Sequence, residues 1–171
     1  SAEYQACARN VFEQVMLIKA MKQYSVKKCI TFHSSIAKAK EFIHNTSSQN
    51  LNLRFALSKL WPSLDKDDIV LDHINGTMSA GDRKRRLDAF KGSKYGIVTN
   101  SHCLTEGVDV PIIDSVYFVN PKNSLIDIVQ ACGRALRKPR DRNDKMAYFI
   151  IPILLPDDEN AAEAINIIDF E

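Results

Sequence analysis

Two arginines in the C-terminal third of the chain have a spacing that suits phosphate binding. Arg134 and Arg137 follow Gln130 and Gly133 in the sequence QACGRALR. If residues 127–136 form a helix, these four positions fall at i, i+3, i+4 and i+7 and share one stripe of its surface. Two planar guanidinium groups on one stripe can each hold phosphate oxygens with two hydrogen bonds. The alternative left open by the residues is a solvated basic helix with a chance glycine.

A turn-forming segment precedes this helix, separated from it by a strand-like run. Residues 107–111 read Gly-Val-Asp-Val-Pro. Gly107 allows a ligand to come close to the backbone, because glycine has no Cβ. The two segments are more informative together than either is alone.

In this order and at this separation, the two segments resemble motifs V and VI of superfamily-two helicases and translocases. The version here reads Thr-Glu-Gly-Val-Asp-Val-Pro, followed by Gln-x-x-Gly-Arg-Ala-Leu-Arg. It most resembles the DNA-translocating branch found in restriction and repair systems. DEAD-box RNA helicases usually carry His-Arg in place of Gln130-Ala131. In this family the pattern lies on the second of two RecA-like domains.

The resemblance implies roles for these residues in ATP hydrolysis. Arg134 and Arg137 would act as arginine fingers, and Gln130 would orient them or the attacking water. Gly107 would approach the nucleotide, and Asp109 would face its sugar or position the finger helix. The sequence contains no Gly-x-x-x-x-Gly-Lys-Ser/Thr loop. We therefore expect ATP and Mg²⁺ to be bound mainly by an N-terminal RecA-like domain of the same polypeptide, and these 171 residues alone to be inactive.

Short β-favouring runs alternate with helical patterns along the chain. The runs cover residues 27–32, 69–75, 95–99, 114–120 and 145–151. Helices between successive strands imply parallel pairing with right-handed crossovers. We predict a three-layer α/β fold with a mostly parallel sheet of about five or six strands, RecA-like but without its own phosphate loop.

Ligands of such folds gather at the carboxyl ends of the strands. By resemblance to the family, the loops there approach the nucleic-acid backbone. Thr99 is the alternative to Ser101 as the contact that follows the third strand, and His33 is a further candidate in the first loop. The predicted contacts are Ser34, Ser35, Gly76, Thr77, Thr99 and Ser101. The alternative, which the residues leave open, is that the serines only cap a helix.

The chain divides into three segments. Residues 1–25 are expected to form a lead-in helix, 26–155 the RecA-like domain, and 156–171 an acidic extension whose pattern fits a short helix.

Trp61 either stacks on a base or covers the edge of the core. Five basic residues between 83 and 91 form either a solvated helix face or a phosphate track.

Charge is unevenly distributed along the sequence. The whole chain has a formal charge of +2, but residues 157–171 hold six of its 21 acids and none of its 23 basic residues. Residues 1–156 therefore carry +8, which favours a polyanionic partner. The four cysteines lack Cys-x-x-Cys spacing and are interpreted as reduced thiols of a cytoplasmic protein. We predict neither a metal site nor a membrane segment.

The expected partner is DNA, with RNA also open, because backbone contacts carry no base information. The full protein is expected to be an ATP-dependent helicase or translocase that works with a nuclease or specificity subunit. The alternative is a non-catalytic nucleic-acid-binding module with a degenerate ATPase site. A dinucleotide-binding enzyme is disfavoured because no Gly-x-Gly-x-x-Gly follows any predicted strand.

Overall fold

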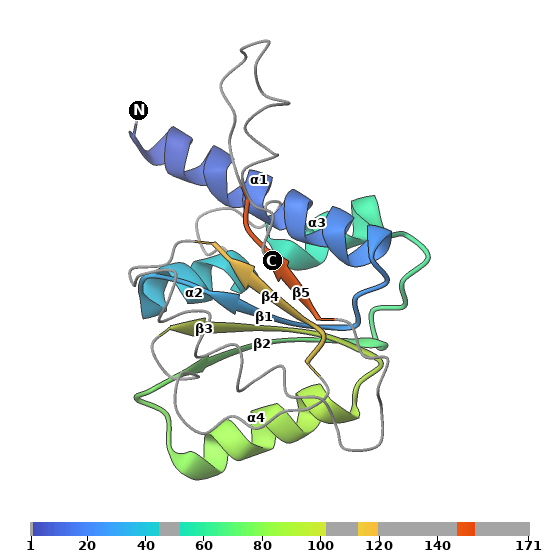
Figure 1. The fold of residues 1–171 in the computed structure, drawn as a ribbon. Coiled ribbons are helices and arrows are strands. Elements are labelled where there is room, and N and C mark those ends of the chain that lie inside the picture. Colours follow the sequence, from blue (N-terminus) through green and yellow to red (C-terminus); the bar gives the residue numbers. More distant parts are fainter. Residues whose placement is uncertain (1, 45–51, 102–112, 120–146, 153–171) are drawn as a thin grey trace, which may run out of the picture.

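The computed structural model describes residues 2–44, 52–101, 113–119 and 147–152 (Figure 1). These residues contain a five-stranded sheet in the order β2-β3-β1-β4-β5, and every pairing in it is parallel. The strands are β1 (Lys28–Phe32), β2 (Ile69–Asn75), β3 (Tyr95–Ser101), β4 (Ser115–Phe118) and β5 (Tyr148–Ile150). The predicted parallel α/β sheet is confirmed.

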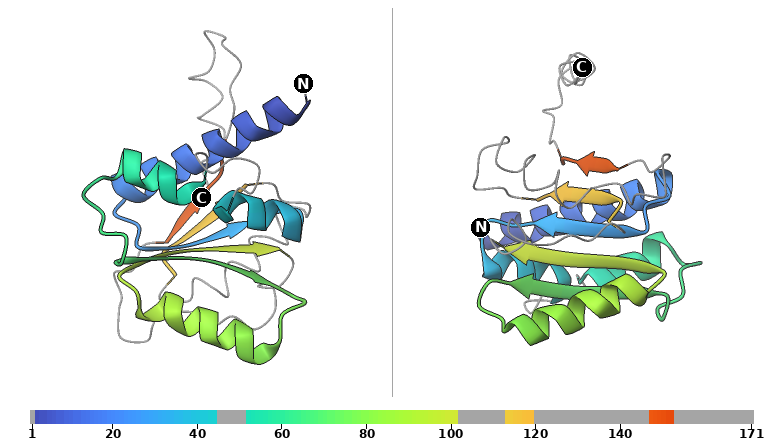
Figure 2. Two further views of the ribbon diagram at one scale, coloured as in Figure 1. Left: turned by 180° about the vertical axis from the view of Figure 1, so that it is seen from behind. Right: turned by 60° about the horizontal axis from the view of Figure 1, so that its bottom comes forward.

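Helices cover both faces of the sheet and complete the three layers (Figures 1 and 2). One face carries α1 (Ala2–Gln23), α2 (Ile36–His44) and α3 (Leu53–Leu60), and the other carries α4 (Ala80–Gly92). The helices predicted over 127–136 and within 156–171 lie outside the described residues. None of the helices in the described ranges is both long and apolar enough to cross a lipid bilayer.

Short polar side chains cap the N-termini of three helices. Ser79 Oγ accepts a hydrogen bond from Asp82 N at 3.1 Å, and Ser35 Oγ accepts one from Lys38 N at 3.2 Å. At α3, Asn52 Oδ1 accepts from Phe55 N at 2.8 Å. Each cap satisfies a backbone donor that the helix itself leaves without a partner.

The core has two layers, one on each face of the sheet, because strand side chains alternate between faces. Leu17, Cys29, Ile97 and Tyr117 are buried beneath α1 to α3. The layer toward α4 is built from Ile30, Ile74, Phe90, Val98, Val116 and Phe118. Trp61 packs at the edge of the first layer, with its ring 5.2 Å from that of Tyr95, as the core-edge interpretation expects.

The third strand is longer than predicted. It runs to Ser101, two residues beyond the expected end at Thr99, because Ile74 and Asn75 of β2 pair with Asn100 and Ser101. Residues assigned to a loop by their sequence are therefore held in the sheet by a neighbouring strand. This pairing fixes the position of Ser101 relative to the end of β2.

Candidate nucleic-acid interface

Three adjacent strands bring most of the predicted contact residues to one edge of the sheet. Because β3 lies between β2 and β1, Ser101 lies between the Gly76–Thr77 turn and the Ser34–Ser35 loop. Parallel strands end at the same edge, so these hydroxyl groups gather there although they are far apart in the sequence.

The predicted contacts differ in exposure. Gly76 and Thr77 are exposed, and Ser35 is partly exposed while its hydroxyl caps α2. Ser34 is buried, with 8% of its surface exposed. Ser101 Oγ is buried and has no hydrogen-bond partner among the described residues.

Thr99 lies two residues before the end of β3. Its side chain is fully buried, and its Oγ1 lies 2.9 Å from Nδ1 of His73 on the neighbouring strand. Both hydroxyl residues proposed at the end of β3 are buried, but Ser101 lies nearer the end of the strand, and the hydroxyl of Thr99 is already engaged by His73. Thr99 therefore forms part of the support beneath the edge.

A buried polar row lies under α2, and the sequence interpretation missed most of it. It comprises Thr31, His33, His73, Asn75 and Thr99. His73 and Asn75 lie on the same strand face as Ile69 and Leu71, so that face changes from apolar to polar toward the carboxyl end of β2. That change of residue type at constant period was the signal available in the sequence.

Two histidines of this row are held in their neutral form. Burial, followed by the nearby His73 and Lys38, lowers the pKa of His33 to about 3. Burial, followed by Lys40, lowers the pKa of His73 to about 4. The ring of His33 also packs against Phe42, with centroids 5.0 Å apart, and its Nε2 lies 2.8 Å from Thr31 Oγ1. Both rings are therefore neutral hydrogen-bonding groups at neutral pH.

The basic residues of α4 are mostly engaged with acidic side chains. Lys84 pairs with Asp88 at 2.5 Å and Arg85 with Asp82 at 2.8 Å, both within the helix. Arg86 reaches across to Asp72 of β2. This pairing favours a solvated helix face over a phosphate track for these three residues.

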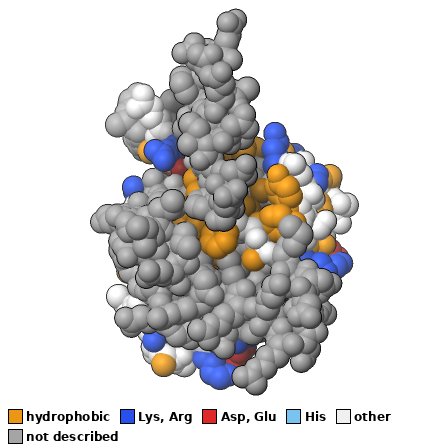
Figure 3. Space-filling model, in the orientation of Figure 1, with side chains coloured by type: hydrophobic (Ala, Val, Ile, Leu, Met, Phe, Trp, Pro, Cys, Tyr) orange, Lys and Arg blue, Asp and Glu red, His pale blue; other side chains and the backbone are white. Residues whose placement is uncertain are grey.

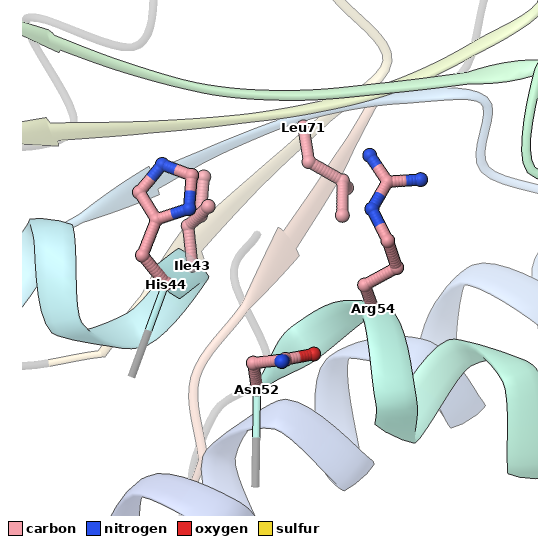
Figure 4. A pocket seen from close by; sticks show the side chains of 5 residues that line it. All are labelled: Ile43, His44, Asn52, Arg54 and Leu71. Carbon is pink, nitrogen blue, oxygen red and sulfur yellow. The ribbon is translucent and has the colours of Figure 1, made fainter. Parts of the chain in front are cut away.

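Other surface features lie apart from the predicted contacts. A pocket of about 130 Å³ between the end of α2, the start of α3 and β2 is lined by Ile43, His44, Asn52, Arg54 and Leu71 (Figure 4). Hydrophobic side chains gather over the region of β5 on the face shown in Figure 3, where the exposed fractions of Phe149 and Ile151 are 48% and 42%.

Comparison with known proteins shows the family. A family model described as the helicase conserved C-terminal domain matches residues 12–139, about three quarters of the chain. The chain belongs to this family. The fold and the family therefore match the resemblance carried by the sequence motifs.

Individual relatives of this helicase C-terminal domain are longer proteins. It is 29% identical over 100 residues to the mitochondrial ATP-dependent RNA helicase MSS116 of Lodderomyces elongisporus, covering 57% of this chain and 14% of that protein. A solved structure of the ATP-dependent Type ISP restriction-modification enzyme LlaBIII bound to DNA is similar with a TM-score of 0.56 and 29% identity, over 77% of this chain and 8% of that one. Domain 2 of the DEAD-box helicase Mss116p bound to an RNA duplex has a TM-score of 0.59 and 16% identity, over 85% and 50%.

The nucleotide-facing residues predicted from the motifs fall in other segments. Gly107, Asp109, Gln130, Arg134 and Arg137 all lie outside the described residues of the helicase C-terminal domain. The described residues do not by themselves fit ATP with Mg²⁺. The connection from β1 to α2 has no glycine to cradle phosphates, and no group of three His, Cys, Asp or Glu side chains in the described ranges is placed to hold a metal ion.

Acid is expected to destabilise this domain through His33 and His73, the two buried histidines among the described residues. The folded pKa values of His33 and His73 lie below the ordinary value of 6.5, so below about pH 6.5 the unfolded chain binds protons that the folded chain does not. The free energy of unfolding should therefore fall by roughly 1.4 kcal/mol per pH unit and per histidine as the pH drops from 6.5 toward 4 for His73 and 3 for His33. Above about pH 7 neither histidine contributes to the pH dependence.

Urea denaturation at about pH 7.5 and about pH 5 measures this effect. Burial raises the pKa of Glu13, which acts with the opposite sign, so single-histidine variants are needed. His73→Asn should flatten the pH dependence, whereas Ser58→Ala, which removes an exposed hydroxyl on α3, should leave it unchanged. Equal slopes for both variants would contradict the assignment.

Proposed function

We propose that the chain is the second motor domain of an ATP-dependent nucleic-acid helicase or translocase. Residues 26–155 would form this domain. The single observation that carries the proposal is that Ser35, Thr77 and Ser101 lie at the carboxyl ends of three adjacent parallel strands, in a chain of the helicase C-terminal family. Loops at this edge would hold the phosphate backbone, which requires hydrogen-bond donors and no base recognition.

The proposed partner for ATP hydrolysis is an N-terminal RecA-like domain of the same polypeptide. That domain would bind most of ATP and Mg²⁺, and this chain would supply Arg134, Arg137 and Gln130 to the shared cleft. Gly107 and Asp109 would face the nucleotide. The absence of a Walker-type loop from the 171 residues supports this division of labour.

We propose DNA as the nucleic acid. The pair Gln130-Ala131 stands where DEAD-box RNA helicases usually have His-Arg, and the restriction enzyme with 29% identity was solved bound to DNA. A role in restriction-modification or repair, with a nuclease or specificity subunit, follows from the same resemblance. Parallel titrations with DNA and RNA of equal sequence and length test the preference, and tighter binding of RNA would reverse it.

Thr77→Ala is expected to weaken binding of a short fluorescein-labelled single-stranded DNA about 3- to 10-fold, because it removes an exposed hydroxyl at the proposed backbone contact. Fluorescence anisotropy at low salt measures the affinity of the 171-residue chain. Ser58→Ala is the matched control, since it removes an exposed hydroxyl on α3. If the two variants bind alike, the contact at Thr77 is wrong.

A further inference from the structure

A hydrogen-bonded chain of side chains runs from the exposed turn after β2 into the sheet. Asn75 Oδ1 accepts from Thr77 N at 2.9 Å and from Thr77 Oγ1 at 2.6 Å. Asn75 Nδ2 lies 3.0 Å from His73 Nε2, and His73 Nδ1 lies 2.9 Å from Thr99 Oγ1. Asn75, His73 and Thr99 are buried, whereas Thr77 is exposed. Three buried polar groups therefore lead to one exposed hydroxyl.

One backbone donor sets the direction of every hydrogen bond in this series of side chains. The N–H of Thr77 can only donate, so the atom of Asn75 that faces it must be the acceptor oxygen. The amide nitrogen of Asn75 then donates to His73 Nε2, which leaves the ring proton on Nδ1 for Thr99. A neutral His73 is required, because a ring with protons on both nitrogens would oppose the Asn75 amide.

The same asparagine holds the turn that presents Thr77. Its backbone oxygen accepts from Met78 N at 3.3 Å, while its side chain accepts from the backbone of Thr77. When Thr77 Oγ1 turns its proton to a phosphate oxygen, it exchanges a neutral hydrogen bond for a charge-assisted one. Asn75 Oδ1 remains satisfied by the N–H of Thr77, so the turn keeps its shape during the exchange.

We infer that Asn75 and His73 are positioning residues for the nucleic-acid contact at Thr77, an inference that rests on the proposed function. Asn75 holds the turn that presents the Thr77 hydroxyl by accepting from the Thr77 N–H, and His73 fixes the Asn75 amide against Thr99 in the next strand. Neither side chain reaches the nucleic acid. Both act through Thr77, and their effect on binding disappears when the Thr77 hydroxyl is absent.

A double-mutant cycle tests this dependence, with the affinity of the 171-residue chain for labelled single-stranded DNA as the readout. Asn75→Ala is expected to weaken binding about 3- to 10-fold in the presence of Thr77. In the Thr77→Ala background the same change should alter the affinity less than about twofold. His73→Leu should behave in the same way with a smaller effect, because it leaves Asn75 in place.

Two further variants separate positioning from general loss of structure. Asn75→Ser keeps a short acceptor for the N–H of Thr77 and should retain more affinity than Asn75→Ala. Asn52→Ala, which removes an asparagine that accepts a backbone N–H at the start of α3, should leave binding unchanged. Thermal unfolding of each variant shows that the folded form is the one titrated.

The outcomes distinguish the inference from the function on which it rests. If Thr77→Ala leaves the affinity unchanged, both the proposed contact and the inference that rests on it are wrong. If Thr77→Ala weakens binding but Asn75→Ala weakens it equally in both backgrounds, the contact stands and the positioning role is overturned. Loss of the Asn75→Ala effect in the Thr77→Ala background supports both.

Discussion

Arg137→Ala is expected to lower the rate of ATP hydrolysis by a factor of about 10³ to 10⁵ in a polypeptide that carries both RecA-like domains. A guanidinium group placed against the transferred phosphoryl group would stabilise the negative charge that develops on it. Arg134→Ala should have a similar effect. Nucleic-acid affinity should change little, because these residues are proposed to face the nucleotide.

Steady-state phosphate release at saturating ATP measures the effect, with Arg85→Ala as the matched control. Arg85 is exposed on α4 and paired with Asp82, so its loss should leave the rate unchanged. The 171-residue chain alone should show negligible turnover. Turnover by this chain that is lost on Arg137→Ala would contradict the proposed division between two domains. A full rate in the two-domain Arg137→Ala variant would favour the non-catalytic alternative.

Phe90→Ala is expected to destabilise the domain by about 3–5 kcal/mol. The Phe90 ring is fully buried in the core layer between α4 and the sheet. Gly96 on β3 lies directly against it, since a Cβ at Gly96 would collide with the ring. The Lys28 ammonium group lies 5.2 Å from the ring centroid and is also bonded to the Phe90 carbonyl oxygen. Removing the ring therefore leaves a cavity that a glycine cannot fill.

The same contact predicts that the energetic cost of an added methyl group at Gly96 depends on the Phe90 ring. Gly96→Ala should cost about 1–3 kcal/mol in the presence of Phe90, because its methyl group would collide with the ring. In the Phe90→Ala background it should cost much less, since the colliding atoms are gone. Urea denaturation measures both values, and Phe55→Ala, at a half-exposed ring on α3, is the control for losing a phenylalanine. Additive losses at positions 90 and 96 would disprove the contact.

Much of the local structure could be predicted from the sequence. The cap at Ser35 and the lead-in helix expected over residues 1–25 placed α1 and the start of α2 within a few residues of their bounds. Those signals can be read from the sequence because they involve only residues a few positions apart along the chain. The motifs around Gly107 and Arg134 indicated the family for the same reason, and the family match over residues 12–139 agrees.

The tertiary structure decided what strand pairing brings together. The order β2-β3-β1 places Thr77, Ser101 and Ser35 on one edge, and pairing with β2 extends β3 to Ser101. The enclosure of Thr99 against His73 likewise depends on residues 26 positions apart. Hydrogen bonds between strands and burial beneath α2 are non-local, so no periodicity within a single segment reports them. The chain alone therefore determined its elements and its family, and only the fold determined which hydroxyls are presented and which are held behind them.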